Sequence, residues 1–387
     1  MKRICSFFAL YGFLSVGVLA QEEAQTGINL GGFVLRPSVS GSLVYDDRLE
    51  YNEATDSATH DVYAETTAGG ELSNQDAQVN VSVRANYGYR YYDDYVENND
   101  DFYNAGGEIG SDAYALRWRL ATDVAKMLGY TWNLENEAVN NSGSIISDEV
   151  NTQWTLNGNL DYTAQISEKT AFVPSYSVQH YYQEFEGSDT AEWQTHQVSL
   201  ISTYGVSQNT IINIGGYYSM QVNDDEDGSI AVLGGGFDTR ITDKTSASLR
   251  GGVGYADYDL SGSDTSGLID LQMNWQATPK LALYVSGGNT YEPGYGGGEA
   301  RMLYRVGYGA SWLPTSRFSI GGSVLHNYED GINGDDDSIY GSVQHFFTLQ
   351  CGYDLTRRLN LALIVNYAND QEPVSRSTVS LRLLYMY

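Results

Sequence analysis

The residues with the clearest chemical potential in this sequence are nine arginines that fall in stretches of alternating apolar and polar residues. A guanidinium group is planar and permanently charged, and it binds a carboxylate or a phosphate through two parallel hydrogen bonds. Arginines that line a pore lower the barrier for anions and raise it for cations. The lumen and selectivity candidates are Arg36, Arg84, Arg90, Arg117, Arg119, Arg250, Arg301, Arg305 and Arg382.

A structural role is the alternative for the same arginines. Each could pair with a carboxylate, such as Asp161 or Asp270, and brace a wall of strands. Both roles require that the arginines face away from lipid, because an ionised side chain in hydrocarbon costs about 2–4 kcal/mol near the middle of a membrane. The sequence leaves both roles open.

Catalytic and metal-binding signals are weak by comparison. The five histidines show no His-x-x-x-His spacing, and His196 with Ser199 lacks a recognisable hydrolase context. The acidic runs 224–228 and 335–338 offer hard oxygen ligands without the spacing of a calcium-binding loop. We expect no enzyme activity, no cofactor and no metal site. Bridging of the acidic loops to lipopolysaccharide by divalent cations stays open.

Alternation with a period of two residues predicts the elements that carry the arginines. In 302–312 the even-numbered residues are apolar or aromatic, and most odd-numbered residues are arginine, glycine or serine. Similar alternation occurs in 153–162, 269–277 and 281–286. Over roughly ten residues, this pattern is typical of transmembrane β-strands. A soluble β-sandwich also alternates, but aromatic residues at both ends of the apolar face favour a membrane barrel.

Two series of residues repeat along the chain at intervals of about 35 to 43 residues, which indicates one hairpin per repeat. The first series marks short turns and consists of Lys126, Lys169, Asn209, Lys244, Lys280, Arg317 and Arg358. The second series marks the far ends of rising strands and consists of Tyr182, Tyr218, Tyr255, Tyr291, Tyr328 and Tyr367.

The hairpin count predicts an all-β, antiparallel up-and-down transmembrane barrel. We expect about 18 strands, with 16 as the alternative, joined by short periplasmic turns and longer acidic extracellular loops. A falling strand is placed at 112–124, a rising strand at 128–137, and a loop at 92–112. The strand at 339–353 places His345 on its apolar face, so we expect a bulge near Gln344.

Composition agrees with a barrel and excludes other classes. The chain carries a net charge of −28 and contains 32 Tyr, 42 Gly and only 6 Pro. A chain this acidic is not expected to bind nucleic acid. After the N-terminal segment, no apolar run is long enough for a transmembrane helix.

The N-terminal segment predicts secretion. Lys2 and Arg3 precede an apolar stretch that ends in small residues at Ala20, which is typical of a signal peptide at 1–20. We expect a short periplasmic segment at 21–32 and the barrel at 33–387.

The C-terminal strand predicts how the protein is inserted. One face of this strand carries Leu381, Leu383, Tyr385 and Tyr387. A final alternating strand that ends on an aromatic residue is typical of substrates of the barrel assembly machinery. Together the two termini predict the outer membrane of a Gram-negative bacterium.

Three segments carry a family resemblance. Segment 33–48 runs from a strand into an acidic and basic loop, 171–178 repeats its pattern, and 242–249 forms a turn motif. Over nearly the whole chain after the signal peptide, the sequence resembles the β-barrel porin 2 family of outer-membrane proteins. The resemblance implies a porin-like barrel, and it implies no substrate and no catalytic residues.

The sequence therefore predicts a porin-like channel for passive diffusion of small hydrophilic solutes, anionic ones among them. One alternative is an export conduit for an anionic exopolysaccharide, and another is a structural or adhesive barrel with a closed lumen. Segments 92–112 and 46–60 are the expected constriction. The expected partners are outer-membrane lipid, lipopolysaccharide, the barrel assembly machinery and small solutes. The protein is expected as a monomer or a trimer.

Overall fold

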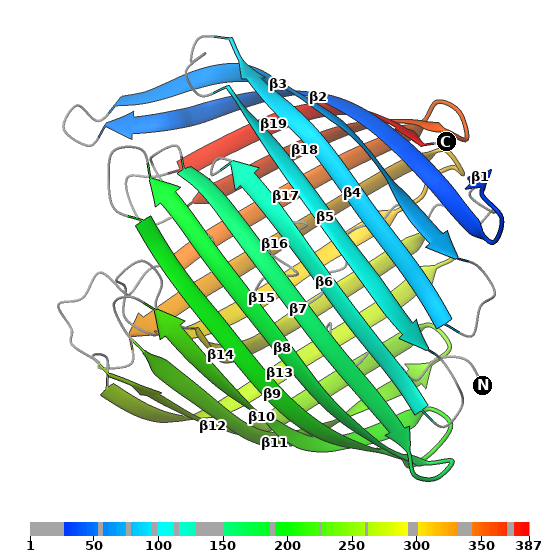
Figure 1. The fold of residues 1–387 in the computed structure, drawn as a ribbon, viewed down its shortest axis with the longest axis vertical. Coiled ribbons are helices and arrows are strands. Elements are labelled where there is room, and N and C mark those ends of the chain that lie inside the picture. The colour runs from blue at the N-terminus through cyan, green and yellow to red at the C-terminus, as the bar shows by residue number, and fades with distance from the viewer. Residues whose placement is uncertain are drawn as a thin grey trace.

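The structure is a computed structural model, and it forms one antiparallel sheet that closes on itself as a barrel (Figure 1). The residues it describes are 27–52, 57–74, 79–93, 99–111, 116–128, 151–185, 190–223, 227–259, 262–292, 301–331, 343–369 and 375–386. Within these ranges, no helix is long and apolar enough to cross a membrane. The prediction of an all-β, up-and-down barrel of eighteen strands is confirmed.

Each barrel strand pairs with its neighbours along the chain. In chain order the strands are β2 (Phe33–Asn52), β3 (Ser57–Asn74), β4 (Val79–Tyr92), β5 (Asp100–Ser111), β6 (Leu116–Leu128), β7 (Asn151–Gln165), β8 (Thr170–Phe185), β9 (Thr190–Gly205), β10 (Thr210–Asn223), β11 (Gly228–Thr242), β12 (Thr245–Tyr258), β13 (Gly262–Thr278), β14 (Leu281–Glu292), β15 (Arg301–Trp312), β16 (Phe318–Gly331), β17 (Val343–Asp354), β18 (Leu359–Asn369) and β19 (Ser375–Met386).

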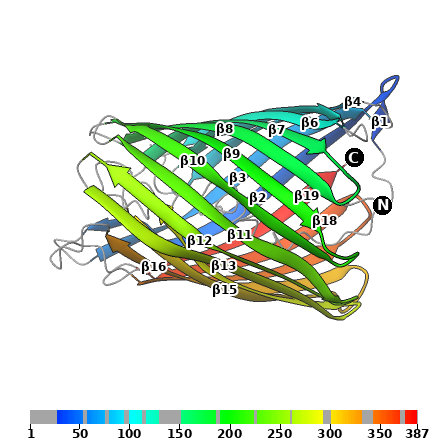
Figure 2. The same cartoon turned by 90° about the horizontal axis from the view of Figure 1, so that it is seen from below.

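The barrel closes where β19 pairs with β2, from Thr378 opposite Asp46 to Met386 opposite Ser38. A two-residue strand, β1 (Ile28–Asn29), adds to the start of β2. β1 and the end of β19 lie at the same end of the barrel (Figure 2). Closure leaves no strand with an edge that is unpaired along its whole length.

The end of the barrel that holds β1 carries a repeated tight turn. In each turn a Ser or Thr hydroxyl accepts a hydrogen bond from the backbone N–H two residues later, as Thr242 does from Lys244 at 3.1 Å. The equivalent pairs are Ser167 and Lys169, Ser207 and Asn209, Thr278 and Lys280, Thr315 and Arg317, and Thr356 and Arg358. This chemistry explains the repeated turn residues in the sequence. We call this end the short-turn end and the opposite end the long-loop end.

The two faces of the sheet differ as the alternation predicts. On the outer face large apolar residues are exposed, with Leu233 of β11 at 70% and Ile214 of β10 at 61%. The intervening residues face the barrel interior and are mostly polar or small. Along β13 exposed and half-buried residues alternate almost without interruption. The outer face therefore suits lipid, and the inner face carries the charges.

The N-terminal part of the barrel differs from the prediction. Segment 100–111, expected within a loop, is strand β5, and 46–60 belongs largely to the β2–β3 hairpin. Segment 112–124, expected as a falling strand, lies largely in β6, which rises toward the long-loop end. The predicted rising strand at 128–137 falls outside the described residues after Leu128. The predicted constriction in 92–112 and 46–60 is therefore wrong where these segments form barrel wall.

The predicted bulge near Gln344 is also wrong. β17 pairs with β16 and β18 without a shift in register. His345 occupies the same face as Phe347 and Leu349, which are 41% and 50% exposed on the outer face. A histidine on the lipid-facing side is thus a real feature of this strand.

Candidate functional site on the inner face of the barrel

The eight candidate arginines whose side chains the structure describes lie on the inner face of six strands. In each strand they alternate with the exposed apolar residues. Arg301 is the first residue of β15, and its side chain is outside the part that the structure describes. The other positions are Arg36 in β2, Arg84 and Arg90 in β4, Arg117 and Arg119 in β6, Arg250 in β12, Arg305 in β15 and Arg382 in β19.

Arg250 is the centre of a tight charge triad across three strands. Its Nη2 donates to Oδ1 of Asp238 in β11 at 3.3 Å, and its Nη1 lies 3.5 Å from Oδ1 of Asp270 in β13. Asn213 of β10 donates to the second carboxylate oxygen of Asp238 at 3.0 Å. Four adjacent strands are thereby connected by side chains. We call Asp238, Arg250 and Asp270 the tight triad.

Arg119 forms a looser triad of the same design. Its Nε lies 3.9 Å from Glu108 in β5 and 3.9 Å from Asp161 in β7. Both distances exceed hydrogen-bond reach. Half of the Arg119 side chain is exposed, compared with a quarter for Arg250. We call Glu108, Arg119 and Asp161 the loose triad, and its guanidinium is the more accessible of the two.

A third set of charges crosses β2 to β6. Arg36 donates to Ser73 at 2.7 Å and lies 3.5 Å from Glu71, which is opposite Arg84 in the register of β3 and β4. Gly106 of β5 leaves room for the Arg84 guanidinium, because a Cβ there would lie 3.3 Å from the Nε of Arg84. The same Cβ would lie 3.1 Å from the Cβ of Asp123, so Arg84 and Asp123 approach each other across a glycine.

Arg90 is buried, unlike the other arginines. Its side chain is 0% exposed, and it donates through Nε and Nη2 to Glu65 at 2.8 and 2.6 Å. Its Nη1 donates to the hydroxyl of Tyr92 at 3.1 Å, and its guanidinium lies over the ring of Tyr63 at 4.7 Å. Asp46, expected in an acidic loop, is fully buried on the inner face near this cluster. Arg90 therefore has the surroundings of a structural residue.

Carboxylates balance the arginines on the inner face. Within the part of the chain that the structure describes, Arg84 and Arg382 form no ion pair. The carboxylates that share the inner face are Asp46, Asp61, Glu65, Glu71, Glu108, Asp123, Asp161, Asp238, Asp264 and Asp270. The wall is thus close to charge-neutral instead of strongly basic.

The β14–β15 hairpin narrows the interior near the long-loop end. The pairing of β14 with β13 stops at Gly288 opposite Asp270, although β13 continues to Gly262. Beyond this point the side chain of Asn289 forms two hydrogen bonds with the backbone of β13, in place of a paired strand. Its Oδ1 accepts from Ile269 N at 2.8 Å, and its Nδ2 donates to Gly267 O at 2.9 Å.

The tip of this hairpin packs against the inner wall. Tyr291 and Met302 are 4% and 5% exposed, and they join Ile230, Ala256 and Tyr258 in one apolar cluster. The hydroxyl of Tyr291 donates to Asp264 at 2.9 Å. Its ring lies so close to Gly254 that a Cβ there would be 2.7 Å away. The hairpin tip is therefore held inside by both apolar and polar contacts.

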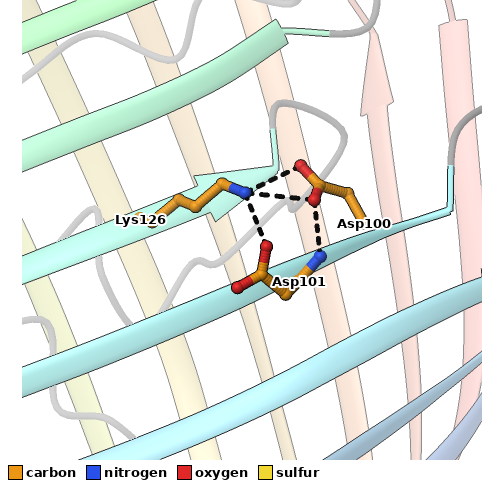
Figure 3. A network of polar contacts seen from close by, with 3 residues as sticks. All are labelled: Asp100, Asp101 and Lys126. Atoms are coloured by element: carbon orange, nitrogen blue, oxygen red, sulfur yellow. Dashed lines mark hydrogen bonds and ion pairs between the residues drawn. The ribbon is translucent and has the colours of Figure 1, made fainter.

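Lys126, expected in a short turn, lies near the long-loop end of β6. Its ammonium group donates to both carboxylate oxygens of Asp100 at 3.1 and 2.9 Å and to Asp101 at 2.8 Å (Figure 3). The strand β5 places both aspartates within reach of β6. The turn prediction is wrong here, because a basic residue alone does not distinguish a turn from a strand end.

The residues proposed as the assembly signal lie on the last strand. Leu381, Leu383 and Tyr385 are exposed on the outer face of β19. Tyr387 is outside the described residues, as is the predicted signal peptide at 1–20. Arg382, between them, is opposite Ser42 and Ala362 on the inner face.

Several functional residues escaped the sequence prediction. Glu108 was missed because its strand was taken as a loop, and Asp238 because pairing across strands depends on register. Tyr291 was recognised as the end of a strand, but its inward packing depends on Asn289. In the register, Asp161 is directly opposite Arg119 and Asp270 is directly opposite Arg250. Glu108 and Asp238 lie two positions from the residues opposite these arginines, so they reach them diagonally.

No protein-family model matches the sequence, and no curated protein sequence matches it. Solved structures share the fold. OccAB4 of Acinetobacter baumannii is similar with a TM-score of 0.50 and 10% identity, over 94% of this chain and 99% of that chain. The siderophore receptor PirA of Acinetobacter baumannii is similar with a TM-score of 0.50 and 10% identity, over 94% and 81%. For the outer membrane protein OpdK of Pseudomonas aeruginosa, the TM-score is 0.49 and the identity is 11%, over 91% of this chain and 98% of that chain. At 10% identity, the likeness to OccAB4 and to PirA shows the barrel fold alone.

Proposed function

We propose that this protein is an outer-membrane channel through which small hydrophilic solutes diffuse passively. The observation that carries the proposal is the contrast between the two faces of a closed eighteen-strand barrel. The outer face is apolar and the inner face holds the arginines and carboxylates. A barrel of this strand number is wide enough that wall side chains alone do not fill it. Membership in the β-barrel porin 2 family is proposed on segments 33–48, 171–178 and 242–249 alone.

The loose triad is the proposed contact for anionic solutes. Arg119 is half exposed, and its carboxylate neighbours are beyond hydrogen-bond reach. A solute carboxylate or phosphate can therefore take the guanidinium donors that the wall leaves unused. Because carboxylates balance the arginines elsewhere, we propose only a modest preference for anions over cations.

The partners that we propose for the barrel follow from its apolar outer face. Outer-membrane lipid covers the apolar belt, and lipopolysaccharide meets the long-loop end. We propose that the barrel assembly machinery recognises the strand that contains Leu381, Leu383 and Tyr385. No catalytic role is proposed.

Single-channel recording in planar bilayers tests the channel directly. The refolded protein is expected to give steady conductance steps, and a KCl gradient is expected to give a small reversal potential of the sign for anion preference. A correctly folded barrel without any conductance would exclude the diffusion channel.

A barrel closed near the long-loop end is the second candidate function. It is favoured by the apolar cluster that Tyr291 and Met302 form with the inner wall. Replacement of Tyr291 by alanine removes its contacts with Asp264 and Gly254 and is expected to raise the conductance. The matched control is Tyr255→Ala, which removes a tyrosine from the outer face of β12 and is expected to leave conductance unchanged. Equal conductance in Tyr291→Ala and the wild type would show that this hairpin does not restrict the path.

A further inference from the structure

Two histidines face each other across β16 and β17 on the outer surface. His326 and His345 are direct partners in the register. Their Nδ1 atoms are 2.8 Å apart, and their rings stand at 83° with centroids 4.8 Å apart. Because the strand pairing is continuous here, the backbone places both residues opposite each other on the same face of the sheet. We call these residues the histidine pair.

The histidine pair lies close to aromatic residues that mark the long-loop end. Tyr304 and Tyr328, whose rings are 5.9 Å apart, occupy the next outer positions toward the long-loop end. On the other side, the hydroxyl of Tyr308 lies 3.5 Å from Nε2 of His326. Aromatic residues at the ends of the apolar belt mark the boundary between lipid and water. The pair therefore lies next to this boundary, one outer position from it.

The geometry of the pair suits a metal ion. Only one Nδ1 can carry the hydrogen of a His–His hydrogen bond, and the other presents its lone pair. When neither Nδ1 is protonated, both lone pairs are available to one ion. At metal–nitrogen distances of about 2.0–2.1 Å, neighbouring ligand nitrogens lie roughly 2.9 Å apart in a square-planar site and roughly 3.3 Å apart in a tetrahedral one.

We propose that His326 and His345 form a two-histidine chelate for a divalent transition-metal ion with tetragonal geometry, Cu²⁺ before Ni²⁺. The Nδ1 separation of 2.8 Å matches neighbouring positions of such a site. Imidazole suits these metals, and Cu²⁺ binds more tightly than the other divalent ions of its row. Among the described residues, no group of three or more His, Cys, Asp and Glu side chains could hold a metal. Water completes the coordination.

A metal at this position would connect β16 to β17 at the rim of the wall. An ion that binds the folded barrel and not the unfolded chain stabilises the fold in proportion to its occupancy. The two histidines are 19 positions apart in the chain, and the register of β16 and β17 brings them together.

Cu²⁺ binding to the refolded protein, prepared without a histidine tag in detergent micelles, tests the proposal. Electron paramagnetic resonance with one equivalent of Cu²⁺ is expected to show coupling to two imidazole nitrogens. His326→Asn and His345→Asn are each expected to weaken binding by about ten-fold or more, because the second ligand of a chelate binds intramolecularly. Each variant is first checked for folding by its heat-dependent migration in gels.

The matched control is His196→Asn. His196 also faces outward, but its Nδ1 partner is the hydroxyl of Tyr176 at 2.7 Å and not a second histidine. This variant is expected to bind Cu²⁺ as the wild type does. Absence of Cu²⁺ binding in the wild type would overturn the proposal, as would unchanged binding in a folded His326→Asn, His345→Asn double variant. Coupling to a single nitrogen would overturn the chelate as well.

Discussion

The tight triad on β11–β13 and the loose triad on β5–β7 have the same plan and different packing. Each places an arginine of a rising strand between carboxylates of the two neighbouring falling strands. Arg250 approaches its carboxylates at 3.3 and 3.5 Å with a quarter of its side chain exposed. Arg119 stays 3.9 Å from both of its carboxylates with half of its side chain exposed. The same charges thus make close contacts within the wall in one place and leave the guanidinium half exposed in the other.

The side chain of Arg90 is completely buried, so it is less exposed than either Arg250 or Arg119. It makes charge-assisted hydrogen bonds to Glu65 and contacts Tyr63 and Tyr92, without exposure. The three arginines therefore form a series from structural to accessible. For the two roles that the sequence left open, we propose bracing of the wall for Arg90 and Arg250 and contact with solutes for Arg119.

The largest expected effect comes from Arg90→Ala. Removal of a buried charge partner leaves Glu65 without its cation beside the buried Asp46 and Asp61. Such a loss destabilises a protein by about 3–5 kcal/mol. Urea unfolding of the barrel in micelles, followed by tryptophan fluorescence, measures the change. A loss below about 1 kcal/mol would be typical of an exposed pair and would contradict the burial of this site.

Arg250→Ala is expected to have an intermediate effect on stability. The change removes the hydrogen bond to Asp238 and leaves two half-buried carboxylates facing each other. We expect a loss of about 1–3 kcal/mol in the same unfolding measurement. Asn213→Ala is the companion variant, since it removes only the amide contact to Asp238 and should cost less. An Arg250→Ala barrel as stable as the wild type would remove the bracing role.

Arg119→Ala is expected to change stability by no more than about 0.5 kcal/mol, as for most exposed positions. Its effect should appear in permeation. Loss of one charge about 10 Å from an ion path in water changes the energy of an anion and of a cation by about 0.4 kcal/mol each, with opposite signs, which is about four-fold in the ratio of anion to cation permeability. Destabilisation by Arg119→Ala as large as that by Arg250→Ala would abolish the distinction between the two triads.

The smallest expected effect is a difference in salt dependence between the Arg119→Ala and Arg250→Ala variants. At 1 M salt the screening length is about 3 Å, so interactions between exposed charges are largely lost. The selectivity change in Arg119→Ala should therefore fade from low to high KCl. The stability loss in Arg250→Ala should persist, because its hydrogen bond and burial do not depend on screening. Equal salt dependence of the two effects would place both arginines in the same environment.

The sequence predicted the regular half of the barrel well. From Lys169 to Arg358, a hydroxyl residue and a basic or amide residue recur in each short turn, and these turns define the strands between them. Period-two alternation then placed most apolar residues on the outer face. These features are local, because turn chemistry and alternation depend on neighbours in the chain.

The features that the sequence missed depend on contacts across strands. β5 contains Gly106 and Gly107 and few apolar residues on its outer face, so its alternation is weak. The predicted number of strands equals the observed number, because the prediction left out the strand at 100–111 and added one at 128–137, while the structure pairs β6 directly with β7. The partners of Arg119 and Arg250 required the register of three strands. The inward packing of Tyr291 required the bonds that Asn289 makes to β13.

The most direct test is the reversal potential of single channels under a KCl gradient for the wild type, Arg119→Ala and Arg250→Ala. We predict a conducting barrel whose modest anion preference shifts toward cations in Arg119→Ala and shifts less in Arg250→Ala. A barrel that folds and does not conduct would contradict the channel. A larger shift in Arg250→Ala than in Arg119→Ala would contradict the assignment of the accessible arginine.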